Sequence, residues 1–329
     1  MATYQKRGDK WRAIVRKKNV LKTKTFRTKA QAVAWANKIE AEIMENLYQE
    51  VANIPLEKVI DRYLHEVTPQ KRGAKKERQF LYRFQALPIS KISLRHLNED
   101  DFKQWRDERL KKVSSATVLR EWAVIGHILN VAITEWKLLK TNPLKGVKKP
   151  KAPKPRTRRY SQQEIDALVY TSGFSLDEPP TTATARVGAA ILFAIETAMR
   201  AGEIVNLTWE HVHFDDKIAH LPQTKNGWSR DVPLSTTAIK ILKLLEQIAE
   251  GESVFQLTTS RLDALFRKLK NRIMVEDLHF HDTRREALTR LAEKVDVMTL
   301  AKISGHRDLS ILQNTYYAPD MKKVALLLD

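Results

Sequence analysis

The chain of 329 residues contains no cysteine, which excludes disulfides, thiolate metal sites and thiol nucleophiles. Glycine and proline are sparse, with 10 and 12 residues, and no collagen-like or low-complexity pattern occurs. The longest apolar run, near Val187–Ala198, is interrupted by Glu196 and is too short to cross a bilayer. The first residues hold no secretory apolar stretch. These absences predict a cytoplasmic protein with no membrane partner.

Acidic residues are also few. The chain has 39 of them against 58 lysines and arginines, which gives a formal net charge of +19. Such an excess favours a polyanionic partner, most simply nucleic acid, with an anionic membrane surface as the competing interpretation. Apolar residues make up 43% of the chain, too many for a disordered basic tail. The length suits two or three domains with sizeable cores.

Residues 1–52 are expected to form a small α+β domain. The first 29 residues hold eleven basic residues and one acid. Alternation over 11–16 and β-branched residues over 23–27 predict two strands, and Thr28 can cap a helix that continues beyond residue 42. Basic side chains are expected on the open face of this sheet. A solvated sheet that binds nothing is the alternative, but the one-sided charge favours DNA contacts by Arg12, Arg16, Lys24 and Arg27.

Residues 53–145 carry helical periodicity without strand-like alternation, which predicts an all-α domain. Helices are expected near 56–64, 75–87, 98–111 and 115–137, capped at Asn98 or Asp100 and at Ser114 or Ser115. A basic cluster includes Lys75 and Lys76.

A basic linker is expected at residues 146–159. The stretch KGVKKPKAPKPRTRR, residues 145–159, holds eight basic residues, three prolines and no acid. It is too polar to fold alone and is stiffened by proline. It can lie along a phosphate backbone, be a plain solvated linker, or imitate a nuclear-import signal. The first interpretation assigns DNA contacts to Lys148, Lys149, Lys151, Arg158 and Arg159.

Residues 160–329 are expected to form a mainly α-helical domain with one small antiparallel sheet. Ser161 and Glu164 have the spacing of a capping box, and Val187–Ala198 reads as a core helix. Strand-like runs at 218–221 and 232–234 flank the Asn-Gly turn of residues 224–227, a strong hairpin signal.

Four patches in this domain look unlike packing. Arg200 follows the core helix, with Gly202 to permit a tight turn, and it can pair with Glu203 or face an anion. Lys225 lies in the hairpin turn, where a solvent-exposed lysine is the ordinary interpretation. His281 and Arg284 are three residues apart, so they can share a helical face and bind a phosphate.

A zinc site at His279 and His281 is disfavoured because the chain lacks cysteine and an HExxH pattern. The fourth patch begins at Gly305, which can break a helix and present His306. Tyr316 and Tyr317 follow ten and eleven residues after that histidine. A tyrosine pair near a C-terminus is usually packing, but here it follows two arginines, a lysine and two histidines.

The order of Arg200, Lys225, His281-x-x-Arg284, Gly305-His306 and Tyr316 resembles the catalytic signature of the tyrosine recombinases, the bacteriophage integrase family. The similar stretches are TAMRAGEIVNLTW, TKNGWSRDVPLS, LHFHDTRREALTRLA and ISGHRDLS. Residues 1–50 are similar to the arm-site DNA-binding domain of many integrases, and 55–145 resemble their helical core-binding domain. Only the histidine–tyrosine spacing departs from the usual nine residues.

The resemblance implies a site-specific recombinase that cuts and rejoins DNA through a 3′-phosphotyrosine, integrating or excising a phage or prophage-like element. Tyr316 would be the nucleophile, with Tyr317 as runner-up. Further implied roles are phosphate clamping by Arg200 and Arg284, hydrogen-bond donation by His306, leaving-group protonation by Lys225, a general base in His281, and orientation of Arg200 by Glu203. Neither a nucleotide cofactor nor a metal is implied.

The resemblance also implies a homotetramer on double-stranded DNA with core-type and arm-type sites, associated with the bacterial nucleoid. An excisionase and a host DNA-bending protein are possible further partners. The apolar tail at 324–328 would pack on its own domain or on a neighbour. Three alternatives stay open: a non-catalytic DNA-binding regulator of the same fold, a conjugative-transposon recombinase, and a relaxing topoisomerase.

Overall fold

The computed structural model describes residues 2–17, 20–44, 51–154, 156–222 and 228–316. The chain divides into two compact units, Met1–Pro155 and Arg156–Asp329. The division falls inside the segment that the sequence suggests as a linker. Among the sequence-based expectations, Lys225, the hairpin turn at 224–227, Tyr317 and the apolar tail lie outside the described residues.

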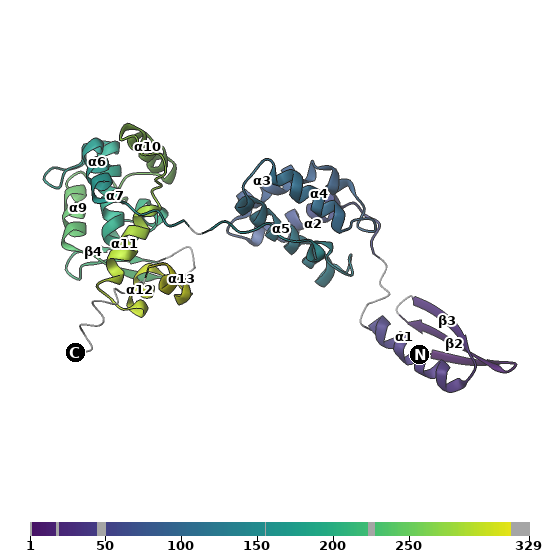
Figure 1. Ribbon diagram of the computed structural model, residues 1–329. Coiled ribbons are helices and arrows are strands. Elements are labelled where there is room, and N and C mark those ends of the chain that lie inside the picture. The colour runs from purple at the N-terminus through teal and green to yellow at the C-terminus, as the bar shows by residue number, and fades with distance from the viewer. Residues whose placement is uncertain (1, 18–19, 45–50, 155, 223–227, 317–329) are drawn as a thin grey trace, which may run out of the picture. The chain divides into compact units, whose positions relative to one another are not determined.

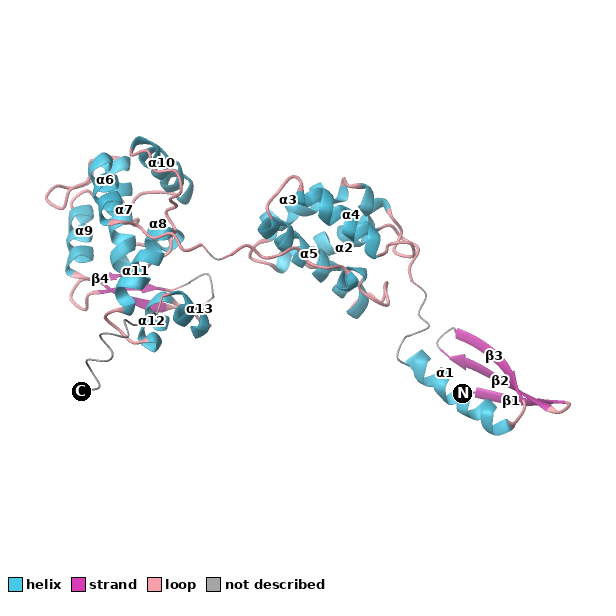
Figure 2. Ribbon diagram, in the orientation of Figure 1, coloured by secondary structure: helices cyan, strands magenta, loops and turns pink. Residues whose placement is uncertain are grey.

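The first part of unit one is a three-stranded antiparallel sheet with one helix on it (Figures 1 and 2). Its elements are β1 (Ala2–Arg7), β2 (Lys10–Lys17), β3 (Val20–Phe26) and α1 (Lys29–Met44). Ala13 and Val15 of β2 form a buried core with the α1 side chains Ala32, Ala36, Ile39 and Ile43. The sequence analysis missed β1, whose burial pattern is mostly exposed and carries little hydrophobic signal.

The register of this sheet determines the face on which each basic residue lies. Arg12 pairs with Thr25, and Ala13 pairs with Lys24. Directly opposed residues on antiparallel strands project to the same face. Lys24 therefore shares the face of Ala13, which packs against α1, and its Nζ lies 5.6 Å from the Phe26 ring centroid. The expectation that lysines and arginines share the open face is right for Arg12 and Arg16 and wrong for Lys24.

The rest of unit one is helical. Its elements are α2 (Leu56–Glu66), η1 (Thr68–Gln70), α3 (Ala74–Gln85), η2 (Pro88–Lys91), α4 (Glu99–Leu110), α5 (Ser115–Thr134) and η3 (Pro143–Gly146). Asn98 caps α4 in a capping box with Asp101, and Ser114 caps α5. The sequence predicts caps at Asn98 or Asp100 and at Ser114 or Ser115, and the structure has the first residue of each pair as the cap.

Helix α5 is the central helix of this core. Eight of its residues are buried, among them Trp122, Ile125 and Leu129. Within the described residues it is also the one helix long and apolar enough, by length and composition, to cross a membrane. The sequence shows no continuous apolar run here, because α5 carries Arg120 and Glu121.

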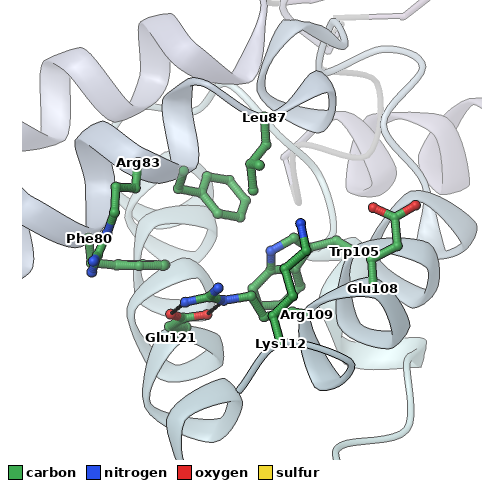
Figure 3. A pocket seen from close by; sticks show the side chains of 9 residues that line it. Phe80, Arg83, Leu87, Trp105, Glu108, Arg109, Lys112 and Glu121 are labelled. Carbon is green, nitrogen blue, oxygen red and sulfur yellow. Dashed lines mark hydrogen bonds and ion pairs between the residues drawn. The ribbon is translucent and has the colours of Figure 1, made fainter. Parts of the chain in front are cut away.

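A small cavity of about 130 Å³ lies between α3, α4 and the start of α5 (Figure 3). Apolar side chains such as Phe80, Leu87 and Trp105 line it. Arg109 donates to both carboxylate oxygens of buried Glu121, at 2.8 and 2.7 Å, beside these walls. This two-pronged pair provides the partner that a buried carboxylate requires.

Unit two is mainly helical with a small sheet, β4-β5-β6 (Figure 2). Its elements are α6 (Gln162–Ser172), α7 (Ala183–Thr197), α8 (Ala201–Val205), η4 (Trp209–His211), β4 (Val212–His213), β5 (Ile218–Leu221), β6 (Arg230–Pro233), α9 (Thr236–Glu246), α10 (Thr259–Arg272), α11 (Asp282–Ala292), α12 (Val297–Ser304) and α13 (Leu309–Thr315).

The core helix of unit two is α7, which packs against α6, α9, α10 and α11. Ten of its residues are buried, which explains why the sequence shows it as an apolar run. A second, smaller cluster joins Ala198 to Ala287, Leu288, Leu300 and Leu312. It fixes α11, α12 and α13 to the end of α7. The short strand β4 was not expected from the sequence.

The Ser161 capping box offers a test of local stability. Ser161 Oγ accepts from the Glu164 amide at 3.2 Å, and Glu164 Oε2 accepts from the Ser161 amide at 2.9 Å. Ser161→Ala should destabilise unit two by about 1 kcal/mol, the usual cost of losing a cap. Native-state hydrogen exchange of α7 amides would measure this loss. Ser260→Ala, one residue inside α10, should change it by less than about 0.5 kcal/mol. Equal effects of the two substitutions would contradict the assignment.

Candidate active site

Arg200 is positioned by a sharp turn between α7 and α8. Ala198 ends α7 in the left-handed region, with φ 53°, and Arg200 is the N-cap of α8. The sequence predicts that Gly202 permits this turn, and that prediction is wrong. Gly202 lies inside α8, and Ala198 makes the turn. A left-handed alanine costs about 1–3 kcal/mol and persists only where surrounding contacts hold it. Here Arg284 Nη1 donates to the Ala198 carbonyl.

Glu203 lies between two arginines. Its Oε2 accepts from the Arg200 backbone amide at 2.9 Å, and its Oε1 accepts from Arg200 Nη1 at 2.8 Å. The Arg230 guanidinium forks onto the same carboxylate, with distances of 3.0 and 2.6 Å. Burial raises the pKa of Glu203, but the bonds and charges of Arg230 and Arg200 outweigh it and lower that pKa to about 2. Glu203 is therefore ionised at neutral pH.

Two arginines converge on the end of α12. Arg284 of α11 is buried, and its Nη2 donates to the Ser304 carbonyl at 2.6 Å. Arg230 of β6 donates through Nε to the Ile303 carbonyl at 2.9 Å. Since Gly305 and His306 follow directly, these bonds fix the backbone that presents the histidine.

Gly305 has a specific steric role in this arrangement. Its φ is +69°, and a Cβ added there would lie 3.2 Å from Arg230 Nη1. Glycine therefore allows both the left-handed end of α12 and the close approach of Arg230. The prediction that Gly305 ends a helix before His306 is confirmed.

His306 and Tyr316 face each other across the same region. The His306 Nδ1 atom lies 2.7 Å from Ser304 Oγ. The rings of His306 and Tyr316 have centroids 6.5 Å apart, and the Arg285 guanidinium lies 5.3 Å from the Tyr316 centroid. Tyr316, directly after α13, also packs against the small cluster of Ala198 and Leu288.

The pKa values reflect the crowding of positive charge. Burial, followed by the charge of Arg200, lowers the pKa of Arg284 to about 9. Burial, followed by Arg284, Arg200 and Arg230, lowers the pKa of His306 to about 4. Partial removal from water and the charge of Arg284 lower the pKa of His281. Mutual repulsion of this kind is characteristic of a site built to receive an anion.

Most of the expected catalytic residues are brought into mutual electrostatic range. The pKa of Arg284 responds to Arg200, Glu203 and Tyr316, and that of His306 responds to Arg284 and His281. Lys225 and Tyr317 lie outside the described residues.

Sequence reasoning missed Arg230. The signal was present: on a strand, Arg230 shares a face with Val232, which is buried, and a buried arginine requires an acidic partner.

The basic residues expected to contact DNA have varied surroundings. Arg16, Arg27, Lys75, Lys76, Lys148, Lys149 and Lys151 are exposed. Arg158 pairs with Glu164, and Arg159 Nε donates to Glu286 Oε2 at 2.9 Å. The last part of the expected linker therefore binds to unit two itself. DNA contacts of all these residues stay predictions.

The described residues also bear on a metal site. Among them, no group of three or more histidine, aspartate or glutamate side chains lies close enough together to hold a metal ion.

Unit two is mainly helical and brings Arg200, Arg284 and His306 near Tyr316, in agreement with the resemblance to the tyrosine recombinases. A family model described as the phage integrase family matches residues 159–323. The chain belongs to the phage integrase family and is a tyrosine-type site-specific recombinase.

The chain is similar to several curated and solved proteins. A putative integrase/recombinase of Haemophilus influenzae is 52% identical over 327 residues, covering 98% of this chain and 88% of the relative. A shufflon-specific DNA recombinase of Escherichia coli is 36% identical over 278 residues, covering 80% and 69%. A lambda integrase tetramer bound to a Holliday junction has the same fold, with a TM-score of 0.67, 14% identity, and coverage of 94% and 96%.

The depressed pKa of Glu203 makes a prediction for acid stability. A carboxylate whose pKa is lower in the folded state stabilises the fold at any pH above its ordinary pKa, here 4.5. That stabilisation is lost as the pH falls towards the folded-state pKa of about 2. Wild type should exceed Glu203→Gln in unfolding free energy by on the order of 3 kcal/mol above pH 5. The difference should vanish near pH 2.

Chemical denaturation of unit two across this pH range would measure the Glu203 effect. Glu246→Gln, on the exposed face of α9, serves as the charge-matched control. A difference between wild type and Glu203→Gln that is independent of pH would contradict the coupling of Glu203 to the two arginines.

Proposed function

We propose that this recombinase cuts DNA through a 3′-phosphotyrosine on Tyr316 and rejoins it to integrate or excise a phage or prophage-like element. The supporting observation is the cluster of Arg200, Arg284 and His306 beside the Tyr316 ring. The cluster repels its own members, so a phosphate among them would relieve that repulsion. The match to the phage integrase family model supports the choice of element.

The chemistry conserves phosphodiester bonds. The Tyr316 oxygen attacks the scissile phosphorus, a new bond joins it to the 3′ phosphate, and the bond to the 5′ oxygen breaks. His281 takes the phenolic proton, and Lys225 gives a proton to the leaving 5′ oxygen. A 5′-hydroxyl of the partner strand later reverses these steps and releases Tyr316. Because no bond is lost overall, the reaction needs no nucleotide cofactor.

The protonation states suit these roles. His281, with its lowered pKa, is neutral at pH 7 and can accept a proton. Ser304 Oγ lies 2.7 Å from His306 Nδ1 but 3.4 Å from the Ala301 carbonyl, so its hydrogen favours the histidine. Nδ1 of His306 then accepts, and Nε2 carries the proton that it can donate to a phosphate oxygen. Arg284, with a pKa of about 9, keeps its charge.

The proposed partner is double-stranded DNA. Unit two and the helical part of unit one would each contact a core-type site, and the N-terminal sheet would bind an arm-type site. The net charge of +19 supports a large phosphate contribution that weakens with salt. The fold shared with a lambda integrase tetramer supports a homotetramer on DNA. An excisionase and a host DNA-bending protein are further partners in this proposal.

Covalent trapping tests the nucleophile. A nicked duplex carrying the recombination site should yield a protein–DNA adduct in the presence of EDTA, because positioned cations replace a metal. Tyr316→Phe should abolish the adduct, whereas Tyr317→Phe should retain it. Denaturing electrophoresis and sequencing of the trapped strand ends would identify the linked residue and the site. An adduct that persists in Tyr316→Phe and disappears in Tyr317→Phe would move the nucleophile by one residue.

Failure of wild type to form any adduct on a site that it binds would favour the non-catalytic regulator. The trapped strand ends also locate the attachment site. Direct repeats at the genomic flanks of the element should match that site if the element is phage-like.

The pH dependence of cleavage tests the general base. The neutral form of His281 is the active one, so the rate of adduct formation should rise with pH and be half-maximal below 6.5. His281→Asn should remove this acidic limb and lower the plateau by about 100-fold or more, the usual contribution of a general base. Single-turnover rates on the nicked duplex would show both effects. If the acidic limb of the pH–rate profile is unchanged in His281→Asn, another group accepts the phenolic proton of Tyr316.

A further inference from the structure

The first residues of unit two form a strap on α11, the helix that carries Arg284. We define the strap as residues 156–160. Arg156 and Arg159 bind acidic side chains of α11, and the Tyr160 hydroxyl donates to the His279 carbonyl at 3.2 Å. Tyr160 is itself buried. The strap therefore holds the turn before α11 and the helix together.

Arg156 makes the most extensive of these contacts. Its Nε and Nη2 atoms donate to Asp282 Oδ1 and Oδ2, both at 2.8 Å. Its Nη1 and Nη2 atoms donate to Asp277, to Oδ1 at 2.6 Å and to the carbonyl at 3.0 Å. Arg156 thus connects the loop before α11 to the first residue of the helix.

Asp282 is the residue through which this contact reaches the site. Only 4% of its side chain is exposed, and its Oδ2 also accepts from the His279 amide at 2.8 Å. A buried carboxylate needs a cationic partner, and Arg156 provides it. His281 directly precedes Asp282, so any shift of this turn moves the histidine.

Helical geometry separates the strap from the catalytic face. Asp282 and Glu286 are four residues apart and lie on one side of α11, where Arg156 and Arg159 bind them. His281 and Arg284 are three residues apart and lie on an adjacent side. The strap therefore contacts α11 on a side other than the one that carries His281 and Arg284.

We propose that Arg156 is a positioning residue of the recombinase: it neutralises Asp282 and so sets the placement and the charge environment of His281. The proposal rests on the proposed function of His281 as the base. Arg156 itself does not touch the reacting atoms. It follows the basic segment 146–154 in the chain, so the catalytic helix is fastened at the point where unit two begins.

The charges around His281 determine the sign of the effect. Burial is the largest cause that lowers its pKa. The charges of Arg284 and Arg285 of α11 and of Arg200, the N-cap of α8, lower it further, and Asp282 raises it. His306 after α12 interacts with it as well. Arg156 offsets the Asp282 carboxylate. Removal of Arg156 should therefore raise the pKa of His281, and removal of the Asp282 charge should lower it.

Five variants test the proposal in the full-length protein: Arg156→Gln, Arg156→Lys, Asp282→Asn, the double variant Arg156→Gln/Asp282→Asn, and Arg267→Gln. The last removes a charge from an exposed pair on α10 and is the matched control. The ring-proton titration of His281 by NMR and the pH profile of adduct formation are the readouts. Binding to intact duplex DNA, followed by fluorescence anisotropy, separates an effect on the base from lost affinity.

Arg156→Gln should move the His281 titration and the acidic limb of cleavage upward by about half a pH unit or more. Asp282→Asn should move both downward, and the double variant should lie close to wild type. Arg267→Gln should leave the His281 titration and the pH profile of cleavage unchanged. The affinity of all the variants for intact duplex DNA should stay within about threefold of wild type, because each loses at most one exposed phosphate contact. Arg156→Lys keeps the positive charge, so His281 should titrate close to its wild-type pH in this variant.

Two outcomes would overturn the proposal. One is a His281 titration that is the same in Arg156→Gln, Asp282→Asn and wild type. The other is a double variant shifted as far as Arg156→Gln, which would mean that Arg156 acts without Asp282. If Arg156→Gln does not fold, comparison of the double variant with Asp282→Asn decides: the His281 titration should lie higher in the double variant, and equal titrations in the two would overturn the proposal. The NMR titration needs no cleavage, so a wild type without adduct would refute the proposed function while this test still gives its answer.

Discussion

Repulsion between buried cations is the constraint on which unit two depends. Burial, followed by the charges of Arg284, Arg200 and Arg230, lowers the pKa of His306 to about 4. A fold can hold such a group only if other contacts outweigh the repulsion. Glu203 supplies one negative charge, shared between Arg200 and Arg230. The remaining positive charge is what the proposed phosphate would neutralise.

Helix ends supply much of the stabilisation that carboxylates do not. Arg284 donates to the carbonyls of Ala198 and Ser304, which lie at the C-terminal ends of α7 and α12. Carbonyls there lack helical partners and form the negative end of the helix dipole. Both helices stop at a left-handed residue, Ala198 or Gly305, which turns the chain sharply. The left-handed conformations of Ala198 and Gly305 thus have the same consequence: each ends a helix where its carbonyls can accept hydrogen bonds from the buried Arg284.

Local features of the fold could be predicted from the sequence, and features set by pairing between distant segments could not. The caps at Ser114 and Ser161 depend on neighbouring residues, and the structure confirms both. The face occupied by Lys24 depends on the register between β2 and β3. The role of Arg230 depends on α8 and α12, which lie far from it in the chain. The order of site residues was visible because they follow one another along the chain; their distances were not.

The basic segment at 145–159 shows why a count of charges is a poor guide to what each charge does. Its eight basic residues look equivalent in the sequence. In the structure, Arg156 and Arg159 bind acids that lie more than 100 residues away, at Asp282 and Glu286. Arginine suits these buried carboxylates because its planar fork can bind both oxygens at once. The lysines of the segment lack that geometry. The change from lysine to arginine along the segment therefore coincides with the point at which the chain begins to bind α11.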